Sequence, residues 1–271
     1  MRPLRLRLGL VVHRSRPAAA DVATALAQAA AARDIETVPV DLASGVASDV
    51  GVIIGIGGDG TLLEAAQVAH RTSIPVAGIN LGTVGYLTEF EADGLDDLLD
   101  AVAAWPRREL ERMTVQATTA DGRCWNGIND VVLEKVMSQR IVRIAVSIDE
   151  EYFTTYRADG IIVATPLGST AYSLSVGGPV LDPQLEALVV SPVAPHSLLS
   201  RSLVLDRSTV IEFTVVGERP VRVNLDGREA CVLGDGETLT VQRGERPVRF
   251  VTRGASPFPQ AVRRQFGLDH A

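Results

Sequence analysis

The sequence predicts an N-terminal α/β domain with a parallel sheet, followed by a mainly β C-terminal domain. Three observations support this prediction. Over residues 1–105, apolar runs of strand length alternate with stretches of helical period. A glycine-rich loop directly follows one of these runs, at the end of a strand, where α/β sheets bind ligands. Over residues 106–255, short β-rich runs are separated by Gly, Asp and Pro, which indicates a second domain of a different kind.

The elements of the first domain follow from local periodicity. The leucines of residues 4–10 alternate with Arg and Gly, which favours a strand with one buried face over a transit peptide, although the first 20 residues hold five arginines and no acid. Pro17 opens an Ala-rich helix that ends near Arg33. The elements expected next are a strand near 37–40, a strand at 50–54, a helix from Thr61 to about His70 and a strand at 75–79.

The second domain is predicted from shorter signals. Its expected strands are residues 115–118, 130–133, 142–148, 161–164, 210–216 and 221–225. The last part of the chain, residues 256–271, contains a segment from Phe258 to Leu268 that is predicted to be helical.

The glycine loop, residues 55–61, reads Gly-Ile-Gly-Gly-Asp-Gly-Thr and sets one carboxylate, Asp59, among glycines. Glycines let a backbone approach a phosphate closely, and the N-terminus of a helix offers unpaired N–H donors. The loop therefore has the composition of a phosphate site that carries an acid. A strand-to-helix turn without a ligand is the simpler alternative, because Gly and Asp tolerate tight turns.

Two better-known nucleotide motifs fit this loop less well. The glycine spacing matches G-x-G-x-x-G, but the acidic residue expected about 20 positions later is missing, since no Asp or Glu lies between Glu64 and Glu89. A Walker A loop needs a lysine, and Lys135 is the only lysine of the chain. Asp59 is then left as a general base or metal partner for phosphoryl transfer.

A second motif lies in residues 159–183. A short apolar strand is followed by a turn and a short helix, with Ser169 as the expected N-cap and Gly177 and Gly178 past the helix end. The small polar side chains and Tyr172 would line a flat pocket able to hydrogen-bond and stack on a nucleobase. A capped helix with no ligand explains the residues of this segment equally well.

Together, the two motifs resemble the NAD kinase family. The Gly-Gly-Asp-Gly-Thr loop alone is shared with diacylglycerol and sphingosine kinases, and in variant form with phosphofructokinases. The Gly-Ser-Thr-Ala-Tyr-Ser segment at 168–173 is similar to part of the NAD pocket of NAD kinases. Asn129-Asp130 and residues 195–198, Pro-His-Ser-Leu, also resemble family motifs. The resemblance implies the NAD kinase/diacylglycerol kinase-like fold, with residues 256–271 returning to the first domain.

The sequence departs from the family pattern at four positions. It has Leu167, Ser202, Arg228 and Thr83 where the family commonly has Thr, Pro, Gln and Arg. Arg228 leaves one contact near NAD open, and Thr83 leaves a phosphate contact open.

The resemblance implies transfer of the terminal phosphoryl group of ATP, or of polyphosphate, to the adenosine ribose 2′-hydroxyl of NAD, giving NADP. Asp59 is the implied general base. Mg²⁺ or another divalent cation is expected, because the glycine loop has no lysine to neutralise phosphate charge, although no metal-ligand cluster is legible in the sequence. The implied phosphate-binding residues are Gly57, Gly58, Gly60 and Thr61. The implied NAD-binding residues are Asp59, Gly60, Asn129, Asp130, Arg140, Arg157, Asp159, Thr170, Ala171, Tyr172, Ser173, Leu174 and Ser175.

Composition narrows the class of partner. A net charge of −7 argues against nucleic acid as a partner, and no apolar run approaches the length of a membrane span. Two cysteines, Cys124 and Cys231, offer neither a disulfide framework nor a metal-site spacing, which favours the reducing cytoplasm. The family resemblance implies a homodimer or homotetramer.

Two other functions share part of this pattern. A related lipid kinase would share the glycine loop but has no need of Asn129-Asp130 or of the segment from Thr170 to Ser175. A protein that senses NAD without catalysis would keep that pocket. Asp59 weighs against the sensor, because a carboxylate among phosphate-binding glycines repels the phosphate unless it has a catalytic or metal-binding role.

Overall fold

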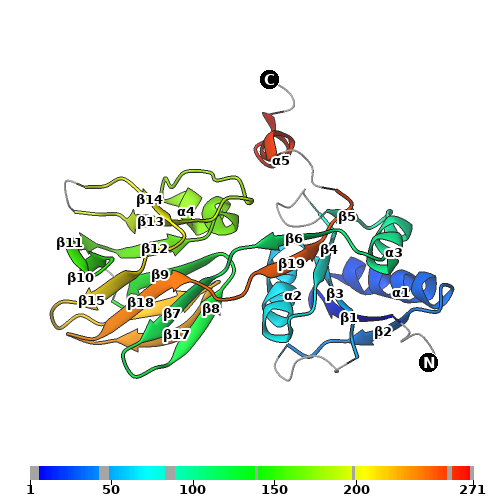
Figure 1. The fold of residues 1–271 in the computed structure, drawn as a ribbon, viewed down its shortest axis with the longest axis horizontal. Coiled ribbons are helices and arrows are strands. Elements are labelled where there is room, and N and C mark those ends of the chain that lie inside the picture. The colour runs from blue at the N-terminus through cyan, green and yellow to red at the C-terminus, as the bar shows by residue number, and fades with distance from the viewer. Residues whose placement is uncertain are drawn as a thin grey trace. The chain divides into compact units, whose positions relative to one another are not determined.

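The computed structural model of the chain describes residues 6–42, 49–82, 89–137, 140–196, 199–254 and 258–268. The chain divides into two units, unit 1 with residues Met1–Glu111 and Val248–Ala271, and unit 2 with Arg112–Pro247 (Figure 1). The sequence analysis set the boundaries at 105 and 255. They lie instead at 111 and 247, because β6 (Glu109–Arg112) and β19 (Val248–Val251) both belong to the sheet of unit 1.

A seven-stranded sheet forms the centre of unit 1, in the order β2-β1-β3-β4-β19-β6 with β5 also paired to β4. Its other strands are β1 (Arg7–Val12), β2 (Glu36–Pro39), β3 (Val52–Gly57), β4 (Val76–Asn80) and β5 (Phe90–Glu91). The pairs of β1 with β2 and β3, and of β4 with β3, β5 and β19, are all parallel. β3 and β4 are buried along their whole length, as expected for a sheet covered on both faces. The prediction of a parallel α/β domain is confirmed.

The helices α1 (Pro17–Ala31), α2 (Asp59–Thr72) and α3 (Leu95–Ala103) pack against this sheet. A further helix, α5 (Phe258–Gln265), follows near the C-terminus. α1 connects β1 to β2 and α2 connects β3 to β4, so the two crossovers run in opposite directions across the sheet. Right-handed crossovers then place α1 and α2 on opposite faces, as Figure 1 shows. The strand order reverses between β1 and β3, and the carboxyl ends at such a point are the usual ligand position in α/β sheets.

Several elements of unit 1 differ from the sequence prediction, such as β3, which is expected at 50–54 and spans Val52–Gly57. Helix α2 begins at Asp59 and not at Thr61, because Gly58 is the N-cap and its carbonyl oxygen accepts the N–H groups of Thr61 and Leu62. Asp59 is therefore the first residue of a helix and not a loop residue. Helix α3, which the sequence analysis did not predict, packs against α1 and β5.

Unit 2 consists of two six-stranded antiparallel sheets. The first has the order β11-β10-β15-β18-β7-β8, and the second has the order β14-β13-β12-β9-β16-β17. The strands of the first sheet are β7 (Val115–Thr119), β8 (Cys124–Gly127), β10 (Val142–Ile148), β11 (Glu151–Ala158), β15 (Ile211–Val215) and β18 (Thr238–Arg243). Those of the second are β9 (Asp130–Lys135), β12 (Gly160–Ala164), β13 (Ala187–Val193), β14 (Leu203–Asp206), β16 (Val221–Leu225) and β17 (Arg228–Leu233).

One apolar core joins the two sheets of unit 2. It includes Ile144 and Phe213 from the first sheet and Leu133 and Ile161 from the second. Along β10, buried residues alternate with more exposed ones, which is the pattern of a strand with one face in a core. A mainly β second domain is confirmed. The predicted strands of this domain do not include β8, β11, β13, β14, β17 or β18. The strand signal is weak in β11, which is rich in polar residues, and in β13, which contains Pro192.

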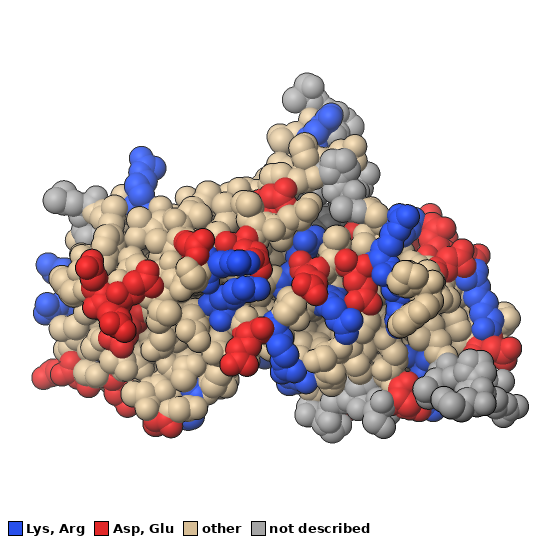
Figure 2. Space-filling model, viewed as in Figure 1, with Lys and Arg blue, Asp and Glu red and all other residues tan. Residues whose placement is uncertain are grey.

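The surface carries both signs of charge. Figure 2 shows acidic and basic side chains interspersed on the face in view, in a chain with 33 acidic and 26 basic residues. Within the part of the chain that the structure describes, no helix is long and apolar enough to cross a membrane.

Candidate functional site

The carboxyl ends of β1, β3 and β4 bring three short segments of unit 1 together. The backbone N–H of His13, just after β1, donates to the Ile56 carbonyl at 3.0 Å. The N–H of Leu81, just after β4, donates to the Gly57 carbonyl at 2.9 Å. The glycine loop therefore lies between the ends of two neighbouring strands.

The glycines of the loop differ in the space that surrounds them. A Cβ on Gly57 would lie 2.7 Å from Thr61 Cβ, and one on Gly55 would lie 3.1 Å from Leu62 Cα, so both positions need glycine for packing. A Cβ on Gly58 or Gly60 would meet no atom within 4 Å among the described residues. Packing against those residues therefore does not require glycine at these two positions.

Asp59 stands at the N-terminus of α2, half-buried beside this open space. The positive end of the helix dipole stabilises a negative charge there, whether it belongs to Asp59 or to a bound phosphate. Together, the carboxylate and the N–H groups at the start of α2 can accept a proton and bind an anion at one place.

Two further residues at this edge were missed by the sequence analysis. Asn80 is buried at the end of β4, donates from Nδ2 to the Gly82 carbonyl at 3.2 Å and accepts the Gly82 N–H at 3.3 Å. Arg16 donates to the Leu81 carbonyl at 3.5 Å, which brings a cation to the same edge. No local pattern singles out either residue, because each is placed here by strand order. Thr83 lies outside the described residues.

In unit 2, Asp226 holds the turn that carries Asn129 and Asp130. Its carboxylate accepts the backbone N–H groups of Ile128 at 2.8 Å, Asn129 at 2.7 Å and Asp130 at 3.2 Å. Asp226 has a φ of 49° and Gly227 one of 77°, so the tight turn between β16 and β17 aims this carboxylate at a segment about a hundred residues away in the chain. From the sequence, an Asp-Gly pair such as Asp226-Gly227 predicts only a turn.

The turn that carries Asn129 packs directly against the second motif. A Cβ on Gly168 would lie 2.7 Å from Asn129 Cα, and the Asn129 carbonyl accepts the Thr165 N–H at 2.9 Å. Thr165 Oγ1 donates to the Ile128 carbonyl at 2.7 Å. Asn129 Oδ1 is buried and has no hydrogen-bond partner among the described residues. A buried acceptor without a partner is costly, so a ligand N–H or O–H that reached it would be favoured.

The second motif forms two short turns of helix and not one capped helix. A 3₁₀ helix, η1, spans Leu167–Thr170, and α4 spans Tyr172–Ser175. The prediction that Ser169 is an N-cap is wrong, because Ser169 lies inside η1, donates to the Pro166 carbonyl and accepts the Leu181 N–H. Gly177 has a φ of 88° just past α4, as a helix-ending glycine does.

Side chains of this segment differ in what they face. Tyr172 is 41% exposed and Ser175 is exposed, while Thr170, Ala171 and Leu174 are half-buried. Ser173 is fully buried, and its Oγ lies 3.2 Å from Ser191 Oγ. Ser173 therefore packs into the interior and holds the segment against β13, whereas Tyr172 has an exposed ring on which a base can stack.

Charged groups surround Tyr172. Burial raises the pKa of its hydroxyl, and the charges of Glu134, Asp159 and Asp130 raise it further. Asp159 is paired with Lys135, whose Nζ lies 2.6 Å from Asp159 Oδ1. The structure thus brings Asn129, Asp130, Asp159 and Tyr172 into one group.

The other predicted positions lie outside the group formed by Asn129, Asp130, Asp159 and Tyr172. Arg140 and Arg157 line a cavity with Arg143 and Arg219. Of the departures from the family pattern, Leu167 is buried at the start of η1, and Ser202 Oγ lies 2.8 Å from Ser191 Oγ. Ser197 and Leu198 lie outside the described residues.

Asp130 is the most perturbed acid of this group. Burial raises its pKa to about 7, and the neighbouring charge of Asp226 contributes in the same direction. A carboxyl with this pKa holds a proton about half of the time at neutral pH, so it can donate or accept a hydrogen bond.

Stability should depend on pH through Asp130. Because its pKa is raised by folding, the folded chain keeps a proton that the unfolded chain loses above about pH 4. We expect this contribution to stability, roughly 4 kcal/mol, to be present below pH 4 and lost as the pH rises to about 7. Urea unfolding of the wild type and Asp130→Asn between pH 4 and 8 measures it, and the advantage of the Asn variant should grow over this range.

Asp121→Asn is the matched control for this experiment. Asp121 is exposed, and its pKa is lowered, first by a hydrogen bond from Thr119. Its replacement should therefore give no gain in the free energy of unfolding that grows between pH 5 and 8. Parallel stability curves for the wild type and Asp130→Asn would contradict the raised pKa.

Comparisons with known proteins point to one family. The model of the ATP-NAD kinase N-terminal domain matches residues 41–106, and that of the ATP-NAD kinase C-terminal domain matches residues 128–253. The NAD kinase of Gemmatimonas aurantiaca is 38% identical over 226 residues, which cover 80% of this chain and 78% of that protein. The NAD kinase of Moorella thermoacetica is 39% identical over 218 residues, covering 79% and 70%.

Solved structures share the fold. Yeast NADH kinase complexed with NADH has a TM-score of 0.90 at 21% identity, covering 100% of this chain and 90% of that chain. An NAD kinase from Archaeoglobus fulgidus in complex with ATP has a TM-score of 0.77 at 24% identity, covering 97% of both chains.

Proposed function

The chain belongs to the NAD kinase family and phosphorylates NAD to NADP, and we propose that Asp59 and the glycine loop around it carry out this reaction. The observation that carries the proposal is the position of Asp59 at the N-terminus of α2, beside two glycines, Gly58 and Gly60, that leave open space. A carboxylate at a helix N-terminus, where the helix dipole favours negative charge, suits proton removal next to a bound phosphate.

In the proposed reaction, the phosphates of ATP, or of polyphosphate, lie against Gly57, Gly58, Gly60 and Thr61, where the N-terminus of α2 favours negative charge. Asp59 accepts the proton of the adenosine ribose 2′-hydroxyl as the 2′-oxygen attacks the terminal phosphorus. The bond from that phosphorus to the bridging oxygen breaks, and ADP, or polyphosphate shortened by one phosphate, leaves with the electron pair. A positioned base contributes about 10² to 10⁴ in rate, and positioning and charge neutralisation supply most of the rest.

A divalent cation is part of the proposal. No three His, Cys, Asp or Glu side chains gather as a metal site among the residues described. Mg²⁺ needs no such cluster when one or two carboxylates and substrate phosphates bind it, and Asp59 beside the phosphate position fits this mode. Bound Mg²⁺ would neutralise the charge that develops on the transferred phosphoryl group.

For the acceptor, we propose that unit 2 binds the adenosine part of NAD. Asn129 Oδ1, buried without a partner among the described residues, is suited to accept from the nucleoside, and Asp130 to pair with a ribose hydroxyl. Tyr172 would stack on a ring, with Asp159 nearby and Thr170, Ala171, Leu174 and Ser175 beside it. Arg140 and Arg157 would contribute positive charge for the phosphates of the dinucleotide.

The glycine loop offers a test by matched variants. Gly57→Ala forces a methyl group against Thr61, so we expect a loss of about 1–3 kcal/mol in the free energy of unfolding. Gly58→Ala meets no atom of the described residues and should change stability by less than about 0.5 kcal/mol. It should raise the KM for ATP about tenfold, because the methyl group occupies the space where the phosphate approaches. An unchanged KM in stable Gly58→Ala would show that the loop is only a turn.

The direct assay is NADP formation from NAD, Mg²⁺ and a phosphoryl donor, read through an NADP-specific dehydrogenase. ATP and inorganic polyphosphate are compared as donors, and NAD and NADH as acceptors. The alternatives of an NAD sensor or a lipid kinase are not favoured by the relatives of the chain. Protein that binds NAD but forms no NADP with any donor would restore the sensor.

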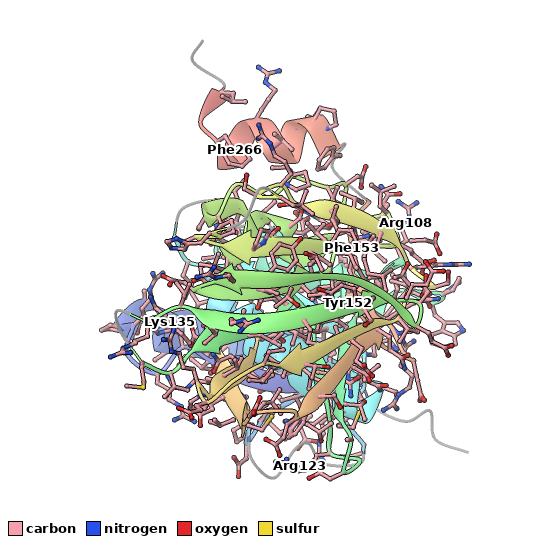
Figure 3. All side chains as sticks on the ribbon, turned by 90° about the vertical axis from the view of Figure 1, so that its left-hand side faces the viewer. Arg108, Arg123, Lys135, Tyr152, Phe153 and Phe266 are labelled. Atoms are coloured by element: carbon pink, nitrogen blue, oxygen red, sulfur yellow. The ribbon has the colours of Figure 1, made fainter. Side chains whose placement is uncertain are left out.

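The assembly and location are proposed as a homodimer or homotetramer in the cytoplasm. β11 is the last strand of its sheet and exposes Tyr152 and Phe153, by 68% and 40% (Figure 3), which supports self-association through that edge. The free thiols of Cys124 and Cys231 suit a reducing compartment. Light scattering coupled to size-exclusion chromatography measures the assembly.

A further inference from the structure

Three serine hydroxyl groups form a continuous series inside unit 2. Ser173 Oγ lies 3.2 Å from Ser191 Oγ, and Ser191 Oγ lies 2.8 Å from Ser202 Oγ. Ser173 belongs to α4, Ser191 belongs to β13, and Ser202 directly precedes β14 (Figure 1). We call these three residues the serine chain. It runs from a buried residue of the second motif to a half-buried residue outside that motif.

Most of the serine chain is completely enclosed. Ser173 and Ser191 have no exposed surface. Ser191 lies opposite Ile162 in the pairing of β13 with β12, and Ile162 belongs to an apolar cluster with Val132 and Val189. Water does not replace a lost hydrogen bond in such surroundings. The removal of one hydroxyl group therefore deprives a buried neighbour of a partner, which is costly.

Gly178 encloses the serine chain on the side of α4. A Cβ at this position would overlap Ser173 Oγ and would lie 3.1 Å from Ser191 Oγ. The Gly178 N–H donates to the Ser173 carbonyl at 2.9 Å. Two hydroxyl groups and a glycine backbone thus fill one tightly packed place. This packing leaves the Ser173 side chain little freedom to find another partner.

Helix α4 depends on the serine chain because it has few other fixed contacts. It spans only four residues, Tyr172–Ser175, and a helix this short is not stable by itself. Its backbone hydrogen bonds stay within residues 171–178. Among the residues that the structure describes, the contact of Ser173 with Ser191 is the one side-chain hydrogen bond that joins α4 to a strand. The position of the neighbouring Tyr172 therefore depends on this contact.

We propose that Ser191 and Ser202 are positioning residues for the NAD site and act through Ser173. A hydroxyl group both donates and accepts, so three in series orient one another whichever way their protons point. The serine chain holds α4 against β13 and thereby sets where the Tyr172 ring lies when NAD binds. Ser191 has no exposed surface, so its effect on NAD is transmitted by α4.

Ser202 is one of the positions at which the sequence departs from the family pattern. The family commonly has proline there, and proline has no hydroxyl group with which to extend the series beyond residue 191. The three-membered series therefore depends on a residue particular to this chain. The inference rests on the proposed function, because α4 matters for NAD only if Tyr172 and its neighbours bind it.

The test compares variants of the full chain. NAD affinity is measured by calorimetry, and the KM for NAD and kcat are measured by NADP formation. Ser202→Ala should weaken NAD binding and raise the KM for NAD about threefold to tenfold, the range that one hydrogen bond supplies. The values of kcat and of the KM for ATP should stay nearly unchanged. Ser202→Thr keeps a hydroxyl group and should bind NAD as the wild type does.

A double-variant cycle separates transmission through the serine chain from a general loss of stability. In Ser191→Ala the connection is already broken, so the addition of Ser202→Ala should not weaken NAD binding further. Additive losses in the double variant would overturn the proposal, as would an unchanged NAD affinity of Ser191→Ala. Should Ser191→Ala not fold, Ser202→Ala and Ser202→Thr decide, and equal NAD affinity of these two overturns the proposal.

Ser208→Ala is the matched control. Ser208 is an exposed serine of unit 2, and its hydroxyl group donates to Asp206 at 2.6 Å. The variant loses a hydroxyl group and a hydrogen bond outside the serine chain. It should bind NAD as the wild type does, and a loss equal to that of Ser202→Ala would count against the proposal.

Tyr172→Ala distinguishes a failure of this inference from a failure of the proposed function. Weaker NAD binding by Tyr172→Ala, together with wild-type binding by Ser202→Ala and Ser191→Ala, would keep the NAD site and remove the serine chain from it. Wild-type binding by Tyr172→Ala would count against the proposed NAD site itself, and the inference would be overturned with it.

Discussion

Asp59→Asn is expected to lower the rate of NADP formation at least about a hundredfold, because the amide cannot take the proton of the attacking hydroxyl. The fold should persist, since Asp59 is half-buried at a helix N-terminus and Asn is also accepted there. The KM values for NAD and ATP should change much less than kcat, because the variant removes a group needed in the transition state.

Asp21→Asn provides the matched control for this variant. Asp21 is an exposed carboxylate on α1, so the variant loses the same charge outside the glycine loop. It should form NADP at nearly the wild-type rate. Equal turnover by Asp59→Asn and the wild type would leave the kinase activity in place and remove Asp59 as its base.

The second large effect is expected at Asp226, which we regard as a positioning residue. Asp226→Asn turns one acceptor of the carboxylate into an amide donor that faces the N–H groups of residues 128–130. Loss of charge-assisted hydrogen bonds to those groups should lower the free energy of unfolding by roughly 2–3 kcal/mol. Because the turn then holds Asn129 and Asp130 less well, the KM for NAD should rise about tenfold or more.

Two readouts separate positioning from general stability. The KM for ATP should stay close to the wild-type value, since Asp226 belongs to unit 2 and the proposed phosphate loop to unit 1. The pKa of Asp130 should fall, because the charge of Asp226 contributes to raising it, and the pH-dependent change in stability should move to lower pH.

Asp121→Asn serves as the control here too, because Asp121-Gly122 is another Asp-Gly turn with a positive φ at its glycine. It should leave the KM for NAD unchanged. A loss of stability in Asp226→Asn without any rise in the KM for NAD would mean that Asp226 only supports the fold.

The Asp-Gly pairs of the chain show what a local sequence pattern can predict and what it cannot. In the sequence, Asp121-Gly122, Asp226-Gly227 and Asp235-Gly236 look the same, and each is a turn in the structure. Only Asp226 accepts three N–H groups from the turn before β9. That contact depends on the pairing of β16 with β9, which joins residues about ninety positions apart.

The sequence by itself determined the fold class, the family and the activity. Apolar residues that recur at every second position, or at helical spacing, indicate which face of a single strand or helix is buried. Each of the two motifs is a continuous stretch of sequence, so it can be recognised without knowing the fold. The start of α2 was misplaced by two residues, because an extended Gly58 can cap a helix and the sequence does not show that it does.

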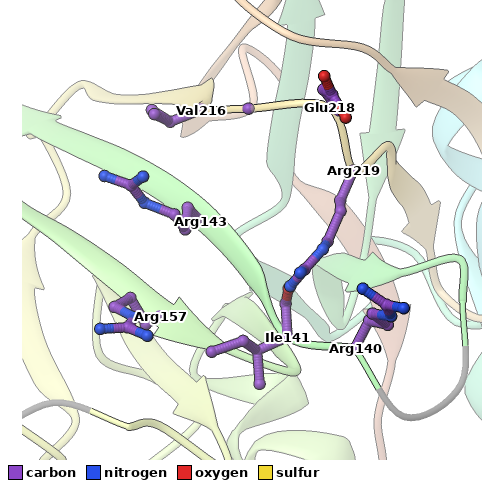
Figure 4. A pocket seen from close by; sticks show the side chains of 8 residues that line it. Arg140, Ile141, Arg143, Arg157, Val216, Glu218 and Arg219 are labelled. Atoms are coloured by element: carbon purple, nitrogen blue, oxygen red, sulfur yellow. The ribbon is translucent and has the colours of Figure 1, made fainter.

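Tertiary structure decided which groups meet. Strand order brought Arg16 and Asn80 to the glycine loop, β19 back to the sheet of unit 1, and Arg143 opposite Arg157 (Figure 4). The physical reason is that pairing register and crossover direction depend on the summed burial of whole faces. No local pattern encodes a contact between two polar side chains that such packing brings together.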